Sequence, residues 1–144
     1  MWYNPIMAGL LRSPLHGLLS QTTMLMTYTG RRSGKTYSTP MNYVLIREAE
    51  DEYFLVTSLR ERTWWRNLRG GAPVVLRVRG RDLTARAEAI ETEAAVAARL
   101  TQFFQLVPAW AKFYQVMLDS DGEPNAADVA EAAKTRVIVR ARVV

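Results

Sequence analysis

The sequence predicts a mainly β, α+β domain in which six antiparallel strands form a small closed or split β-barrel with helices at the rim. Short runs that alternate apolar and polar residues recur along the chain and are separated by turn residues, as in hairpins. Helical spacing is concentrated after residue 91, so strands and helices do not alternate as in a doubly wound sheet. The 144 residues, 49% of them hydrophobic, suit a single domain over residues 1–144.

The chain begins with an apolar helical segment over residues 1–20. Asn4 followed by Pro5 is a favourable helix start. The segment has neither a leading basic region nor a small-residue cleavage site, so it does not resemble a signal peptide. We expect it to cap the floor of the barrel; peripheral contact with lipid is the alternative.

The remaining elements follow from periodicity and turn residues. The predicted strands have extended patterns, several of which alternate apolar with polar or basic residues, and they cover residues 22–29, 37–48, 53–58, 74–79, 83–90 and 135–144. The predicted helices have apolar residues at helical spacing and cover residues 60–69, 92–106, 109–117 and 126–133. Thr63 is expected to cap the first helix and Gly70 to end it. The third places Trp110, Phe113, Tyr114 and Met117 on one face, which is typical of a buried core.

Composition excludes several kinds of chemistry. The chain has no cysteine and only one histidine, His16, so it predicts no disulfide, no zinc site and no Ser-His-Asp triad. We expect the reactive group to come from a cofactor, with the protein supplying binding and orientation. The net charge of +5 favours an acidic partner: a phosphorylated coenzyme, an anionic membrane surface or nucleic acid.

A basic loop within residues 27–40 is the strongest candidate for a binding site. Arg31 and Arg32 offer forked donors to a phosphate or carboxylate, and Lys35 adds a point charge. Gly30 and Gly34 allow the backbone N–H groups to approach a ligand closely. Because strands are predicted on both sides, a solvated hairpin turn is the alternative interpretation.

Several motifs occur in an order that carries a resemblance. They are Thr-Gly-Arg-Arg-Ser-Gly-Lys (29–35), Thr-Pro (39–40), Asn-Tyr (42–43), Thr-Ser (57–58), Thr-Trp-Trp-Arg-Asn-Leu (63–68), Gly-Gly-Ala-Pro (70–73) and Arg-Val-Arg-Gly (77–80). With these motifs the chain resembles the deazaflavin (coenzyme F420)-dependent nitroreductase and quinone reductase family, closely over residues 22–91 and loosely beyond. The resemblance implies a split β-barrel of the FMN-binding, pyridoxamine phosphate oxidase-like type. It also implies reduced F420 as the hydride donor.

The resemblance further implies a set of coenzyme-binding positions. Matched by position, they are Arg31, Arg32, Ser33, Lys35, Thr39, Pro40, Thr57, Ser58, Leu59, Trp65 and Asn67. Arg31, Arg32 and Ser33 match positions that contact the coenzyme's phosphate and acidic tail, whereas Lys35 stands where nitroreductase members often have Gln. The Thr39-Pro40 pair matches a segment that lines the ring, and residues 57–59 match a turn whose backbone N–H groups reach the ring edge.

Two tryptophans and a late tyrosine complete the predicted site. Neighbouring helical residues point about 100° apart, so one of Trp64 and Trp65 should anchor its helix while the other faces the cleft. We expect Trp65 to face the cleft. Trp110 and Tyr114 match the substrate pocket, and Tyr114 is the candidate catalytic residue, as proton donor; packing, with solvent as the proton source, is the alternative.

The function implied by the resemblance is hydride transfer from reduced F420 to an electron-poor acceptor such as a quinone, an enone or a nitroaromatic. A quinone is favoured because an apolar N-terminus and a cationic surface would hold the protein near lipid. We expect a cytoplasmic protein, either free or associated with the cytoplasmic face of the membrane. The resemblance also implies a homodimer.

Three alternatives stay open. The same barrel would bind FMN if the basic loop took its 5′-phosphate. A non-catalytic carrier would bind the coenzyme or an anionic lipid without turnover. Nucleic-acid binding is suggested by Trp64 and Trp65 beside basic residues. It is disfavoured because the cations are spread over several elements and interrupted by the acidic residues 48–52.

Overall fold

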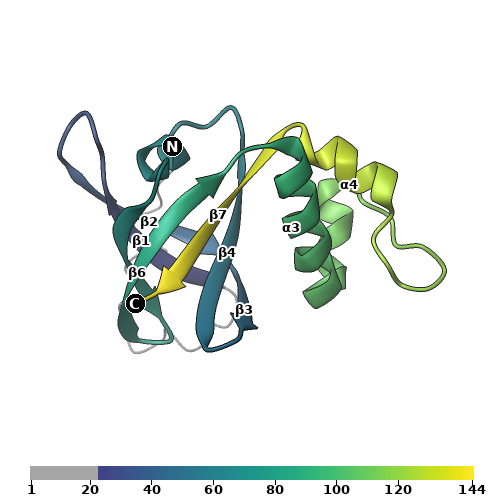
Figure 1. Cartoon of the computed structure of the whole chain (residues 1–144), viewed down its shortest axis with the longest axis horizontal. Coiled ribbons are helices and arrows are strands. Elements are labelled where there is room, and N and C mark those ends of the chain that lie inside the picture. Colours follow the sequence, from purple (N-terminus) through teal and green to yellow (C-terminus); the bar gives the residue numbers. More distant parts are fainter. Residues whose placement is uncertain (1–22) are drawn as a thin grey trace.

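The computed structural model describes residues 23–144, and within them one antiparallel sheet forms the body of the protein (Figure 1). Its seven strands are β1 (Thr23–Thr29), β2 (Thr36–Asn42), β3 (Val44–Glu48), β4 (Asp51–Leu59), β5 (Ala72–Val78), β6 (Arg81–Ile90) and β7 (Arg136–Val143). Across the sheet they lie in the order β2-β1-β5-β6-β7-β4-β3. All neighbouring pairs are antiparallel, which confirms the mainly β, antiparallel prediction.

The predicted number of six strands is wrong, because residues 37–48 form two strands rather than one. β2 and β3 are the two opposite edges of the sheet, and only Tyr43 separates them in sequence. The sheet must therefore curl until its edges approach, and it forms a half-barrel that stays open between β2 and β3. Tyr43 is 6% exposed and packs edge-on against Phe54, with ring centroids 5.1 Å apart. Since tyrosine favours strands, alternation alone could not reveal a break at this residue.

Two hydrophobic clusters lie on opposite faces of the sheet. The alternation along β4 shows this directly, because Phe54 and Val56 belong to the cluster inside the curl while Leu55 belongs to the other. The second cluster is completed by the helical layer, with Phe103 and Phe104 as its largest side chains. The helices after residue 92 therefore cover one side of the half-barrel, as the green and yellow coiled ribbons of Figure 1 show.

The helical elements are α3 (Glu93–Leu106), α4 (Ala126–Ala133) and the short 3₁₀ helices η1 (Trp64–Leu68) and η2 (Pro108–Tyr114). Thr92 caps α3 by accepting a hydrogen bond from the Ala95 N–H, and Asn125 caps α4 by accepting one from Asp128. Thr63 makes no side-chain capping bond to η1, so the cap predicted there is wrong.

The buried aromatic stripe predicted over residues 109–117 is also wrong. The helix ends at Tyr114, because Gln115 adopts a left-handed backbone with φ of 60°. Phe113 and Met117 are consequently 69% and 72% exposed. Trp110 and Tyr114 do pack against Phe103 of α3, with ring centroids 5.4 and 6.3 Å away.

The predicted helix over residues 1–20, with His16, lies outside the described residues. Within residues 23–144 no helix is long and apolar enough to cross a bilayer. The same residues contain no group of three or more His, Asp or Glu side chains that could hold a metal ion.

Candidate active site

The basic loop is the turn between β1 and β2, and its glycines shape it. The Gly30 N–H donates to the Lys35 carbonyl at 2.8 Å, and the Gly34 N–H donates to the Gly30 carbonyl at 2.9 Å. A Cβ on Gly30 would lie 2.8 Å from the Ser33 hydroxyl oxygen and 3.0 Å from the Tyr37 ring. Gly34 has a φ of +68°, which other residues rarely adopt. The loop is thus a hairpin turn, which is also compatible with anion binding because its cations remain exposed.

A hollow of about 780 Å³ opens beside this loop, and we call it the cationic pocket. It is lined by Tyr28, Gly30, Arg31, Arg32, Ser33, Tyr37, Thr63, Trp64, Arg66, Asn67 and Arg69. Asn67 ties its two walls together, because its Oδ1 accepts from the Arg31 backbone N–H at 3.0 Å and its Nδ2 donates to the Trp64 carbonyl at 2.8 Å. The predicted Arg31, Arg32, Ser33 and Asn67 therefore meet here, whereas Lys35 does not line the pocket.

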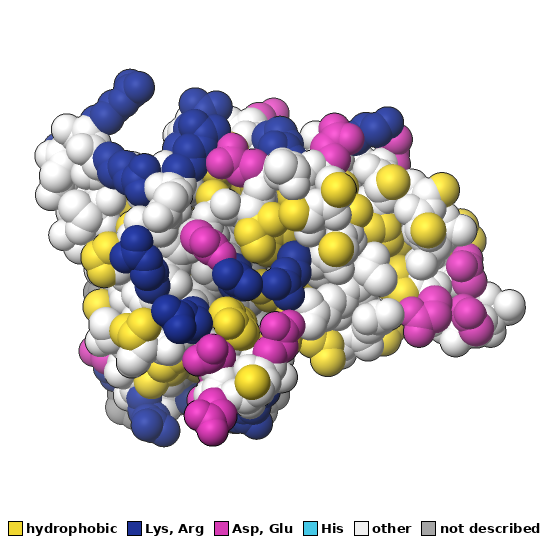
Figure 2. All heavy atoms as spheres, in the orientation of Figure 1, with side chains coloured by type: hydrophobic (Ala, Val, Ile, Leu, Met, Phe, Trp, Pro, Cys, Tyr) yellow, Lys and Arg dark blue, Asp and Glu magenta, His cyan; other side chains and the backbone are white. Residues whose placement is uncertain are grey.

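The charge of the cationic pocket is largely uncompensated. No carboxylate among the described residues lines it. Arg69 is paired with Glu91, whose carboxylate lies 2.8 Å from Nη2, and this hydrogen bond raises the pKa of Arg69. Arg31, Arg32 and Arg66 form no ion pair with any described carboxylate. The donor set suits a ligand with several negative charges. Basic side chains likewise gather over the sheet on the face shown in Figure 2.

The two tryptophans take the opposite places from those predicted. Trp64 lines the cationic pocket and the hollow next to it, and its Nε1 donates to the Ser58 hydroxyl at 3.0 Å. Trp65 lines neither hollow; it is 2% exposed and belongs to the cluster inside the curl. The prediction that Trp65 faces the cleft is therefore wrong. Both side chains are buried in the same cluster, but the direction in which η1 crosses the sheet decides which one also lines the pockets.

A second hollow of about 450 Å³ adjoins the first at Trp64, and we call it the ring pocket. It is lined by Thr39, Pro40, Met41, Val56, Thr57, Ser58, Leu59, Arg62, Trp64, Phe113, Tyr114 and Arg136. β2 and the end of β4 supply most of its floor, so the predicted Thr39, Pro40 and residues 57–59 lie together. Thr39 and Ser58 are each only 7% exposed, which places polar groups in a sheltered position.

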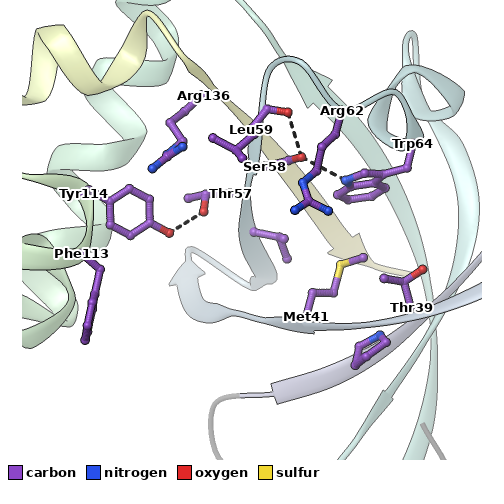
Figure 3. A pocket seen from close by; sticks show the side chains of 12 residues that line it. Thr39, Met41, Thr57, Ser58, Leu59, Arg62, Trp64, Phe113, Tyr114 and Arg136 are labelled. Atoms are coloured by element: carbon purple, nitrogen blue, oxygen red, sulfur yellow. Dashed lines mark hydrogen bonds between the residues drawn. The ribbon is translucent and has the colours of Figure 1, made fainter. Parts of the chain in front are cut away.

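A third hollow of about 560 Å³ adjoins the ring pocket, and we call it the aromatic pocket. It is lined by Met41, Asn42, Val56, Thr57, Phe103, Trp110, Phe113 and Tyr114. The Tyr114 hydroxyl lies at the boundary of the two hollows, 2.5 Å from the Thr57 hydroxyl oxygen (Figure 3). Its ring is held edge-on by Phe104, 5.0 Å away. The predicted pair Trp110 and Tyr114 therefore lines one cavity.

Sequence reasoning missed Arg62, Trp64, Phe113 and Arg136 as lining residues of the ring pocket. Arg136 is more than 70 positions from Arg62 and Trp64 in sequence and reaches them because it lies opposite Leu59 in the β4–β7 ladder. No local pattern marks this pairing. For Phe113 the signal was present but was assigned to the core.

The burial of Tyr28, which lines the cationic pocket, can be tested by the pH dependence of stability. Its burial raises the pKa of its hydroxyl to about 12, against the opposing effect of its hydrogen bond with Thr39. Because this pKa is higher in the folded protein than the ordinary value of 10.0, the unfolded chain loses the proton at a lower pH than the folded protein does. The free energy of unfolding is therefore highest below about pH 10 and falls as the pH rises through about 12.

We expect urea unfolding to show the wild-type protein losing about 2–3 kcal/mol between pH 10 and pH 12 that Tyr28→Phe does not lose. The two proteins differ only at residue 28, so the difference between their curves is the quantity measured. Parallel curves would contradict the assignment.

A comparison with known protein families identifies the family of this chain. The model of the F420H(2)-dependent quinone reductase family matches residues 13–121. The chain belongs to this family. The match spans the basic loop, η1 and Tyr114 and ends before Arg136. The resemblance found in the motifs is thereby confirmed. No curated protein matches the chain.

One solved structure supports the fold alone. It is titled a domain-swapped dimer, is 16% identical with a TM-score of 0.51 and covers 85% of this chain and 81% of its own. Another is the protein Atu2129 of Agrobacterium tumefaciens str. C58, whose title gives its function as unknown. It is 16% identical with a TM-score of 0.49 and covers 92% of this chain and 55% of its own.

Proposed function

We propose that the protein is an oxidoreductase that uses reduced coenzyme F420 to reduce an electron-poor acceptor, with a quinone favoured over an enone or a nitroaromatic. The observation that supports this function is the row of three adjoining hollows. Trp64 is shared by the cationic and ring pockets, and Thr57 and Tyr114 are shared by the ring and aromatic pockets. A polyanionic tail, a planar ring and an acceptor would fit this row in that order.

The residues present fit the coenzyme. Arg31, Arg32 and Ser33 would hold its phosphodiester and oligoglutamate tail by charge-assisted hydrogen bonds, and the cradle at Gly30 has no room for a side chain. Thr39, Pro40 and the residues of β4 would hold the ring. The bound coenzyme would supply a hydride, and one proton completes the reduction of a quinone to a quinol. The protein's own contribution would be orientation and exclusion of water.

Several finer assignments belong to the same proposal. We assign the half-barrel to the FMN-binding split-barrel type. A homodimer is supported by the structural relative titled a domain-swapped dimer. Contact of residues 1–20 with the cytoplasmic face of the membrane, and a cytoplasmic location, stay predictions.

The deciding experiment is a titration with oxidised F420 and, separately, with FMN, followed by coenzyme and tryptophan fluorescence. Reduced F420 is then mixed with the protein and menadione. Micromolar binding selective for F420 with menadione-dependent oxidation is the expected result. Selective binding of FMN would make FMN the coenzyme in place of F420. Binding of F420 without its oxidation by any quinone, enone or nitroaromatic would indicate a carrier.

Tyr114 is proposed as the proton donor to the reduced acceptor. In Tyr114→Phe we expect kcat to fall by about 100-fold, since a positioned general acid contributes roughly 10²–10⁴-fold. The F420 affinity should change far less. Thr57→Val, which removes the hydrogen-bond partner but keeps the hydroxyl of Tyr114, should lower kcat less. Equal kcat in Tyr114→Phe and wild type would make Tyr114 a packing residue.

A further inference from the structure

Two guanidinium groups of the ring pocket have no role in the coenzyme site described above. Arg62 and Arg136 both line this pocket, together with Leu59, Thr57 and Tyr114 (Figure 3). No carboxylate among the residues that the structure describes lines the pocket, and neither guanidinium forms an ion pair with one elsewhere. The pocket therefore offers two uncompensated positive charges.

Arg136 is held in place from two sides. Its backbone carbonyl accepts a hydrogen bond from the Arg60 Nη2 at 2.9 Å, and the β4–β7 ladder sets it opposite Leu59. The guanidinium carbon lies 4.9 Å from the centroid of the Tyr114 ring. Such a contact uses the ring quadrupole, and it leaves the N–H groups at the edge of the guanidinium able to donate to a further partner. Arg136 is thus a positioned donor rather than a solvated surface charge.

The position of these groups separates them from the coenzyme's acidic tail. The tail is assigned to the cationic pocket, whose arginines are a different set: Arg31, Arg32, Arg66 and Arg69. Arg136, by contrast, contacts Tyr114, which also lines the aromatic pocket proposed for the acceptor. Arg136 also lies beyond the residues that the family model matches, so this feature belongs to the chain's own C-terminal strand.

Resting on the proposed function, we propose that Arg62 and Arg136 form an anion subsite for the acceptor, which would be a quinone that carries a carboxylate or sulfonate group beside its reducible ring. The substituent takes no part in the redox step. Its charge-assisted hydrogen bonds to the two guanidiniums would place the ring next to Tyr114 and would favour acidic acceptors over neutral ones.

The test compares two acceptors that differ in charge, menadione and 1,4-naphthoquinone-2-sulfonate. The quantity measured is the ratio of kcat/KM for the sulfonate to kcat/KM for menadione. The two quinones differ in reduction potential, and this difference affects the ratio equally in every variant, so that it cancels when variants are compared. We expect Arg136→Gln to lower this ratio by about tenfold or more, mainly through KM of the sulfonate, and Arg62→Gln with Arg136→Gln to lower it further. Arg136→Lys, which keeps the charge, should retain part of the ratio.

The matched control is Arg47→Gln, since Arg47 is 73% exposed, pairs with Glu52 and lies outside all three hollows. Its ratio should equal that of the wild type. An unchanged ratio in the double variant would overturn the subsite. So would a loss of F420 affinity in Arg136→Gln as large as that in Arg31→Ala with Arg32→Ala, because the pair would then hold the coenzyme.

Binding separates failure of the subsite from failure of the proposed function. Calorimetric titration with the naphthoquinone sulfonate requires no turnover, and we expect its Kd to rise about tenfold or more in Arg136→Gln. If the wild type oxidises no reduced F420 but shows this difference in Kd, the reductase function fails and the anion subsite stands. Absence of sulfonate binding to the wild type, or the same Kd in both proteins, would overturn the subsite.

Discussion

Arg31→Ala combined with Arg32→Ala is expected to weaken F420 binding by about 100-fold or more. Each side chain would make charge-assisted hydrogen bonds worth roughly 1.5–3 kcal/mol, and a loss of about 1.4 kcal/mol corresponds to tenfold in Kd. Both residues lie in an exposed turn, so the free energy of unfolding should be nearly unchanged. Fluorescence titration of F420 measures the affinity, and urea unfolding measures the stability.

The matched control for this double variant is Arg47→Ala with Lys134→Ala. It also removes two positive charges, but from exposed ion pairs outside the cationic pocket. If binding depends on the positions of Arg31 and Arg32, the control should bind F420 like the wild type. An equal loss in both double variants would show that only net charge matters. Unchanged binding in the Arg31 and Arg32 variant would remove the loop from the coenzyme site.

Arg60→Ala is expected to destabilise the protein by about 2–3 kcal/mol, although Arg60 lines none of the three hollows. Its Nη2 donates to the Glu91 carbonyl at 2.8 Å and to the Arg136 carbonyl at 2.9 Å, and its backbone N–H donates to the Thr135 carbonyl at 2.8 Å. The side chain thus joins the chain before α3 to the start of β7. Without it, two partly buried carbonyls lose a charged donor.

Thermal unfolding of Arg60→Ala should show a Tm lower by roughly 6–12 °C, given a few degrees per kcal/mol for a chain of this size. Arg47→Ala serves as the control because surface ion pairs contribute little, and its Tm should change by only about 1–2 °C. A Tm of Arg60→Ala equal to that of the control would show that the two carbonyls find water instead.

The strands and helices followed from the sequence because their signals are local. Alternation in residues 83–90 predicted β6, and helical spacing over residues 92–106 predicted α3. The break at Tyr43 did not follow, because it results from closure of the sheet edges rather than from any local preference. The exposure of Phe113 was missed for a related reason: the left-handed turn at Gln115 ends the helix that would have buried its face.

The candidate site divides in the same way. The sequence by itself determined the basic loop, the absence of cysteine and the family, because composition and the order of motifs do not depend on which distant segments meet in space. Only the tertiary structure decided that Trp64 rather than Trp65 faces the pockets, and that Arg136 joins Tyr114. The first depends on how η1 lies on the sheet. The second depends on the β4–β7 register, and pairing between strands so far apart leaves no periodic signal in the sequence.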